Sequence, residues 1–132
     1  MSSDLVDRPG RRVGAFRGSA YELWLASHLT RATLVHGDTF DASFALFRHG
    51  HADVLAALMP KLLTDRAAWP GSRILEGTFM RVQQSVGTAM RYRGGADFVQ
   101  QFVRHAKASG LVARLIEQHA IVGLKVAPAP AP

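Results

Sequence analysis

The sequence predicts an α/β domain built on a mainly parallel sheet. Strand-type and helix-type patterns alternate along the first half of the chain, which is typical of βαβ units. Residues 52–58 form a nearly continuous apolar run of strand length, as expected for a strand that is covered on both faces. Helix-starting residues, among them Ser19, Thr39 and Pro60, follow the predicted strands. These three observations favour helices packed on a parallel sheet.

The composition fits one soluble domain and narrows the possible partners. The 132 residues are 48% hydrophobic and 20% charged, which supplies enough apolar side chains for a core. No run of about 18 apolar residues occurs, so no membrane-spanning helix is expected. The absence of cysteine excludes disulfides and thiolate metal sites. The formal net charge is +6, but the basic residues are scattered without interleaved aromatic residues, so we expect no nucleic-acid partner.

The first half of the chain contains most of the predicted sheet. Residues 1–10 are expected to be a linker. The elements that follow are a strand at 13–16, a helix at 20–31, a strand at 32–35, a helix from 40 to about 50, a strand at 52–58, a helix at 61–68 and a strand at 73–75. Helical spacing places the inward side chains at Leu23, Trp24 and Leu29 in the first helix and at Phe40, Phe44 and Phe47 in the second.

The second half begins with an unusually long extended segment. Residues 79–91 alternate with a period of two, and at about 3.3 Å per residue they would extend roughly 40 Å. Because this exceeds one strand of a small sheet, we expect the segment to connect two bodies. A helix after Gly94 and Gly95, a last helix at 111–119 and an extended, disordered Ala-Pro tail at 127–132 follow.

Three predicted strand-to-helix turns lie after strands of the sheet. They are residues 17–21, Asp38 with Thr39, and residues 59–61. In open α/β sheets, ligands bind outside the carboxyl ends of the strands, and helix N-termini favour anions there. The turns therefore predict an anion-facing rim. On its spacing alone, the first turn fits an ordinary strand-to-helix turn with a serine cap better than a ligand site.

The order of several short motifs resembles one protein family. The motifs are Arg-Pro-Gly-x-Arg-Val (8–13), Gly-Ser-Ala-Tyr-x-Leu-x-Leu (18–25), Gly-x-Ala-Asp-Val-Leu-Ala (50–56), Pro-Gly-Ser-Arg-Ile-Leu (70–75), Gln-Gln-Ser-Val-Gly (83–87) and Lys-Ala-Ser-Gly-Leu-Val (107–112). Together they are similar to family 3 extracellular solute-binding proteins of bacterial ABC transporters, the polar amino-acid type. No single motif is specific, but the resemblance runs from about residue 4 to residue 128.

The resemblance implies a single periplasmic-binding-protein-like (type II) lobe. Members of the family have two lobes joined by crossing strands, with the ligand between the lobes. This chain resembles the second lobe with a crossing strand (11–91) and C-terminal helices (92–126) that would pack on an absent first lobe. The expected function is therefore that of a truncated substrate-binding component that binds a small amino-acid-like solute and serves a membrane permease. The expected location is periplasmic, although the chain has no signal-peptide pattern.

The resemblance also assigns the candidate ligand-binding residues. Gly18, Ser19 and Ala20 match the family's turn that holds the ligand's α-carboxylate. Leu58 stands where family members have the aspartate that accepts the ligand's ammonium, so the chain departs from the pattern for standard α-amino acids. Arg17 and Lys61 would instead favour an acidic or less polar solute. The full candidate set is Arg17, Gly18, Ser19, Ala20, Tyr21, Thr39, Leu58, Lys61 and Gln84.

Other chemistries have weaker support. His49 and His51 are spaced for a metal site but lack a third placed ligand, so we expect no metal and no cofactor. No catalytic triad or paired acid is visible, and we expect no enzymatic activity. The alternatives to solute binding are a dehydratase-like enzyme on the same fold and a cytoplasmic effector-sensing domain of a regulator. Without a first lobe, an exposed apolar patch on the last helices predicts self-association through Phe98, Phe102, Leu111, Leu115 and Ile116.

Overall fold

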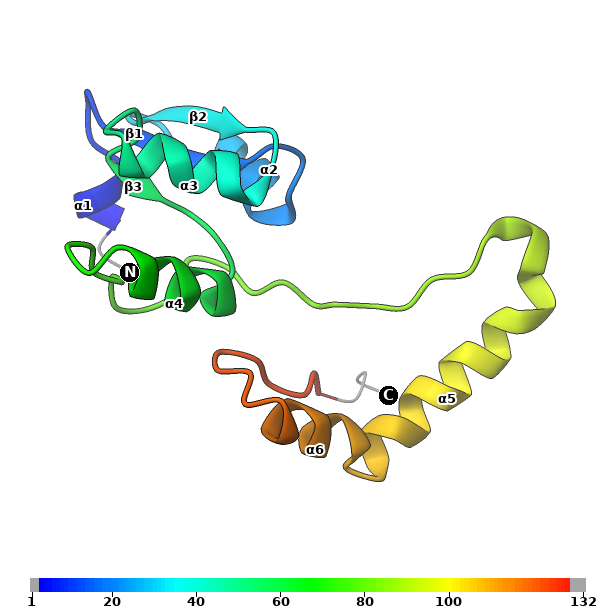
Figure 1. Cartoon of the computed structure of the whole chain (residues 1–132). Helices are drawn as coiled ribbons and strands as arrows, with labels where there is room; N and C mark the ends of the chain where they lie inside the picture. The colour runs from blue at the N-terminus through cyan, green and yellow to red at the C-terminus, as the bar shows by residue number, and fades with distance from the viewer. Residues whose placement is uncertain (1–2, 129–132) are drawn as a thin grey trace. The chain divides into compact units, whose positions relative to one another are not determined.

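A computed structural model describes residues 3–128 of the chain. The chain divides into two units, and the boundary lies between Val82 and Gln83. The first unit contains the sheet and the helices around it, and the second contains the last helices (Figure 1). Within the described residues, none of the helices has the length and hydropathy needed to cross a bilayer.

The first unit is built on three parallel strands in the order β2-β1-β3. They are β1 (Arg12–Phe16), β2 (Thr33–Gly37) and β3 (Val54–Leu55). The central strand β1 pairs along its whole length with β2 and at two positions with β3. Its three middle residues are buried, because it is covered by a strand on each side and by helices above and below. The predicted α/β class and its parallel sheet are thus confirmed.

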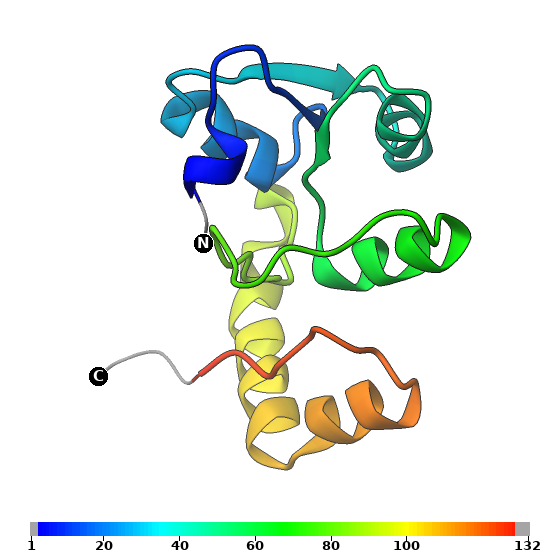
Figure 2. The same ribbon diagram turned by 90° about the vertical axis from the view of Figure 1, so that its left-hand side faces the viewer.

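Helices α2 (Ala20–His28) and α3 (Phe40–Arg48) lie on opposite sides of this sheet (Figures 1 and 2). Two further helices, α1 (Ser3–Val6) and α4 (Met59–Ala68), complete the first unit. The buried apolar core consists of side chains from β1, α2 and the segment after β3, namely Val13, Ala15, Tyr21, Leu25 and Ala56. Burial of these side chains is the main term that holds the sheet and α2 together.

Two predicted inward side chains point outward. Leu23 is 62% exposed, whereas Tyr21 and Leu25 of the same helix are buried. Residues two apart on a helix differ by about 200°, so a helix that buries Tyr21 and Leu25 must expose Leu23. Phe40 at the start of α3 is also exposed. The predicted positions of Trp24 and Leu29 are confirmed, since both pack against the core.

Helix α3 packs on the sheet through a small residue, which is not one of the phenylalanines that the sequence predicts to point inward. Ser43 is buried, and its hydroxyl donates a 2.9 Å hydrogen bond to the Thr39 carbonyl within the helix. A Cβ added to Gly37 would lie 2.6 Å from Ser43 Cα. A glycine at the end of β2 is therefore what lets the backbone of α3 pack directly on the sheet.

The predicted strands outside β1 and β2 are shorter or missing. The run 52–58 forms only the two-residue strand β3, although the N–H groups of Asp53 and Ala56 on either side of it still donate backbone hydrogen bonds to Arg12 and Gly14. Ala52 and Ala56 are buried. Residues 73–75 and 79–91 do not form strands. Within the described chain, residues 81–88 make no backbone–backbone hydrogen bonds, so this alternating segment is extended but unpaired. Phe79, just before it, packs against the core of the first unit.

The predicted linker at the start of the chain is tied to the first unit. It contains α1, and Asp7 accepts hydrogen bonds from the backbone N–H groups of Thr30, Arg31 and Ala32 and from the Thr30 hydroxyl. The bond from Ala32 is the largest of several that hold the pKa of Asp7 far below its usual range. This carboxylate joins the segment before β1 to the loop before β2.

The second unit contains a 3₁₀ helix, η1 (Met90–Gly95), followed by α5 (Ala96–Ala108) and α6 (Leu111–Gln118). The predicted helices are confirmed. Phe98, Phe102 and Leu115 are exposed, with Phe98 at 72%, whereas Leu111 and Ile116 are half-buried. Part of the predicted disordered tail is held, because Lys107 Nζ donates a 2.7 Å hydrogen bond to the Pro128 carbonyl. Residues 129–132 lie outside the described residues.

Candidate functional site

The candidate site is the edge of the sheet at which its parallel strands end. β1 ends at Phe16, β2 at Gly37 and β3 at Leu55, and the next residues begin α2, α3 and α4. Parallel strands end on the same edge, so the three turns lie side by side. In open α/β sheets, ligands bind outside this carboxyl edge.

The first turn, residues 17–21, is held by bonds within the chain. Ser19 caps α2, since its hydroxyl oxygen accepts a 3.2 Å hydrogen bond from the Glu22 N–H. The Glu22 carboxylate in turn accepts a 3.1 Å bond from the N–H of Gly18, the residue before the cap, in a variant of the capping box. Gly18 has φ +75°, a backbone conformation that favours glycine. Two of the donors at this helix tip are therefore satisfied by the chain itself.

Tyr21 brings a buried hydroxyl to this turn. The side chain belongs to the core, and its Oη makes no hydrogen bond within the described residues. Burial raises the pKa of the Tyr21 phenol, so the group is neutral at pH 7. The Ser19 side chain, the Phe16 backbone and the charge of Lys61 partly oppose this rise in the pKa. The Tyr21 hydroxyl therefore points toward the strand end and not into the middle of the core.

The second turn is joined to the first by an exposed ion pair. Arg17 Nε donates a 2.8 Å hydrogen bond to Asp38, and the Arg17 N–H donates to the Gly37 carbonyl. Thr39 caps α3 through a 3.0 Å bond from the Ala42 N–H. Arg17 and Thr39 thus lie at the predicted edge, and both already have partners in the chain.

The third turn places an ammonium group between two carboxylates. Lys61 Nζ lies 2.6 Å from Asp65 Oδ1 and 3.2 Å from Asp41 Oδ1. The hydrogen bond to Asp65 is the main reason that the pKa of Lys61 is raised, and the bond to Asp41 adds to it. Leu58, by contrast, precedes α4 as its N-terminal cap residue, and its side chain makes no capping bond. Lys61 therefore links α4 to α3.

Several residues of this edge were missed at the level of sequence. Glu22 and Asp65 are buried acids, and the second oxygen of Asp65 makes no hydrogen bond within the described chain. His36 Nδ1 lies 3.3 Å from Glu22 Oε1, within ion-pair distance but without hydrogen-bond geometry. The Ser-x-x-Glu spacing of residues 19–22 was a visible capping signal, whereas the approach of His36 depends on the β1–β2 pairing.

Other residues that the sequence offers as candidates do not belong to the three turns. Gln84 is an exposed residue of the second unit, whereas the three turns belong to the first unit. Asp53 lies at the opposite end of its strand, where it pairs with Arg12 at 3.0 Å. No three metal-ligating side chains gather in residues 3–128, His49 and His51 included.

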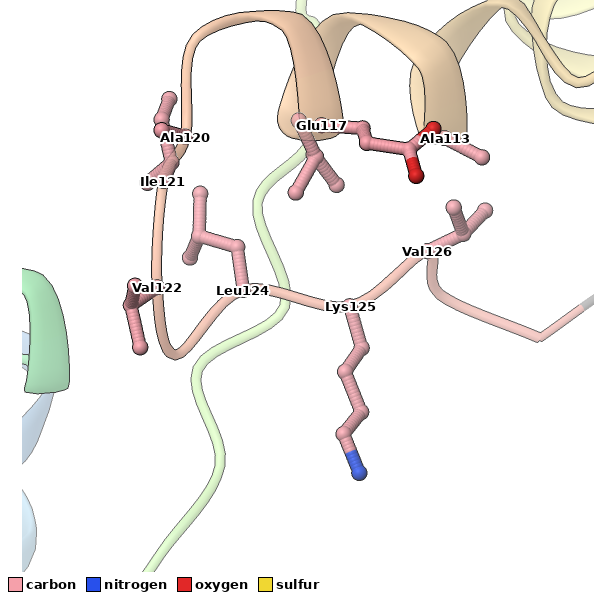
Figure 3. Close-up of a pocket in the computed structure, with 9 residues that line it drawn as sticks. Ala113, Glu117, Ala120, Ile121, Val122, Leu124, Lys125 and Val126 are labelled. Atoms are coloured by element: carbon pink, nitrogen blue, oxygen red, sulfur yellow. The ribbon is translucent and has the colours of Figure 1, made fainter.

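An open groove of about 620 Å³ lies in the second unit (Figure 3). Its lining is mostly aliphatic and comes from α6 and the segment that follows it, namely Ala113, Ile116, Glu117, Ala120, Ile121, Val122, Leu124, Lys125 and Val126. None of the predicted ligand-binding residues contributes to it. The polar chemistry that a small polar solute requires is therefore at the sheet edge and not in this groove.

No protein-family model, curated protein or solved structure matches the chain. Function must accordingly be argued from the site itself.

Proposed function

We propose that this chain is the second lobe of a bacterial solute-binding protein and that it contacts a small, polar, amino-acid-like solute at the carboxyl edge of its sheet. The observation that carries this proposal is the convergence of three strand-to-helix turns on one edge of a β2-β1-β3 parallel sheet. The motif order described above supports the same reading. By that resemblance, the protein would act in the periplasm and deliver its solute to a membrane permease.

A single lobe is expected to bind weakly. Solute sites normally bury most of the ligand surface, and one wall of a cleft buries much less of it. We therefore expect dissociation constants no lower than about 1 mM for the isolated chain. In this proposal, the first turn contacts the solute through the backbone at the start of α2 and the Tyr21 hydroxyl. The capping bonds of Ser19 and Glu22 keep that turn rigid.

The test is a titration followed by amide NMR, which detects millimolar binding. Amino acids, dicarboxylates and small amines are added to the full chain, and the amide shifts of Gly18, Ser19 and Thr39 are recorded. Ala20→Leu places a larger side chain at the tip of α2 and is expected to abolish the shifts. Ala26→Leu, at another exposed position on the same helix, is the matched control and is expected to leave them unchanged. If no solute moves these amides, the proposal is wrong.

A further inference from the structure

The charge at the carboxyl edge is opposite to that of the whole chain. The three turns and the acidic side chains bonded to them hold four carboxylates, of Glu22, Asp38, Asp41 and Asp65, against the two cations Arg17 and Lys61. With His36 neutral, this is a formal charge of −2, whereas the whole sequence carries +6. The acidic edge is therefore a local arrangement and does not follow from composition.

Two of these carboxylates are buried, and one of them has unmet bonding capacity. Glu22 and Asp65 are both more than nine-tenths buried, and Asp65 Oδ2 has no hydrogen-bond partner in the described chain. The buried Tyr21 hydroxyl, near Lys61, is also without a partner. Buried polar atoms are normally paired, so these two unpartnered atoms mark the same edge as a place where a polar group from outside the chain is missing.

Lys61 shows which kind of group the edge stabilises. Its ammonium is held by Asp65 and Asp41 and lies 5.7 Å from the centre of the Phe44 ring. Carboxylates beside an aromatic face are a typical environment for an organic cation. Both predicted anion-binding cations, Arg17 and Lys61, are already neutralised by acids, and α2 and α3 are capped by their own side chains. Little positive charge remains available for an anion.

We infer that the solute bound at this edge carries a cationic group, an ammonium or guanidinium, which Asp41 and its neighbouring carboxylates attract. The inference rests on the proposed function, because it names the class of solute for that same site. It reverses the anion-facing rim that the turns alone predicted. The reason is that Glu22, Asp41 and Asp65 outweigh the dipoles of helices whose tips are already capped.

The test compares arginine, glutamine and glutamate at one ionic strength and pH 7, with the full chain and the amide shifts of Gly18 and Thr39 as readout. A unit charge about 4 Å from a carboxylate in water is worth about 1 kcal/mol, or about fivefold in affinity. We therefore expect arginine to bind at least about fivefold more tightly than glutamate. Glutamine is expected to fall between them.

Matched variants locate the attraction. Asp41→Asn removes an acid whose side chain is 93% exposed, so the fold is retained, and arginine binding is expected to weaken by about two- to fivefold. Glu76→Gln removes an exposed acid outside the three turns and is expected to leave arginine binding unchanged. Equal weakening by both variants would refute the placement of the cation at this edge.

The remaining outcomes separate the two proposals. If glutamate or glutamine moves the same amides and binds as tightly as arginine, the solute class is wrong and solute binding at this edge stands. If none of the three amino acids moves the amides of Gly18 and Thr39 at tens of millimolar, amino-acid binding at this edge fails and the inference fails with it.

Discussion

Replacing Gly37 with alanine tests how closely α3 packs on the sheet. A Cβ at this buried position would lie 2.6 Å from Ser43 Cα and 2.5 Å from Ser43 Oγ, and it would also overlap the Ser43 nitrogen. Two of these atoms belong to the helix backbone, so no rotamer change removes the overlap and α3 must move. Overpacking of this kind costs about 1–3 kcal/mol. The lower entropy of the unfolded alanine chain offsets about 0.4–1 kcal/mol of that cost.

The assay is urea unfolding followed by circular dichroism. With an m value of about 1–3 kcal/mol per M, a net loss of about 1–2 kcal/mol lowers the midpoint by roughly 1 M. Gly71→Ala is the control, because the nearest atom to its new Cβ is Trp69 Nε1 at 3.8 Å, an ordinary contact. Its midpoint is expected to stay the same or rise slightly. A Gly37→Ala midpoint equal to that of Gly71→Ala would refute the close packing of α3 on β2.

Three further changes test other features. Because the folded pKa of Asp7 is depressed, its carboxylate stabilises the fold above about pH 4, and this contribution is lost as the pH falls. Asp7→Asn should therefore lower the urea midpoint at pH 7 and flatten the decline of that midpoint toward pH 2. Parallel pH profiles of the midpoint in both proteins would contradict this. Tyr21→Phe removes a buried hydroxyl that has no hydrogen-bond partner in the described residues, so the free energy of unfolding should stay within about 1 kcal/mol of the wild-type value or rise. A larger loss would reveal a hydrogen bond to that hydroxyl. The exposed phenylalanines of α5, Phe98 and Phe102, should cause self-association at tens of micromolar, measured by light scattering. Replacing both (Phe98→Asp with Phe102→Asp) should restore the 14.3 kDa monomer. A wild-type chain that is already monomeric would rule these side chains out as an interface.

The fold class followed from sequence because local signals and tertiary structure agree in the first unit. The helices begin where their caps predict, at Ser19 and Thr39, since the capping bond is local and needs no distant partner. Strands were predicted less well. Residues 79–91 have the period of two that is typical of a strand, but they pair with no neighbouring strand. A period of two indicates only that a segment is suited to pairing.

The position of the three turns was predicted from the sequence, but the charge around them was not. The turns were placed because parallel strands end on one edge, which topology alone dictates. The acidity of that edge depends on Glu22 and Asp65 being buried beside it, and burial is decided by tertiary packing. Lys61 with Asp65 is an i, i+4 pair and was readable in the sequence, whereas the contact of Lys61 with Asp41 requires α3 and α4 to be neighbours.

The unpaired segment 81–88 is a favourable position for proteolytic cleavage of the chain. Proteases bind their substrates in extended form, and most sites in a folded protein must first unfold locally to reach it. Here the backbone of residues 81–88 makes no hydrogen bond to another backbone group of the described chain, and Arg81 gives trypsin a cleavage position at its start. Brief digestion should thus release the sheet-containing half as one resistant fragment.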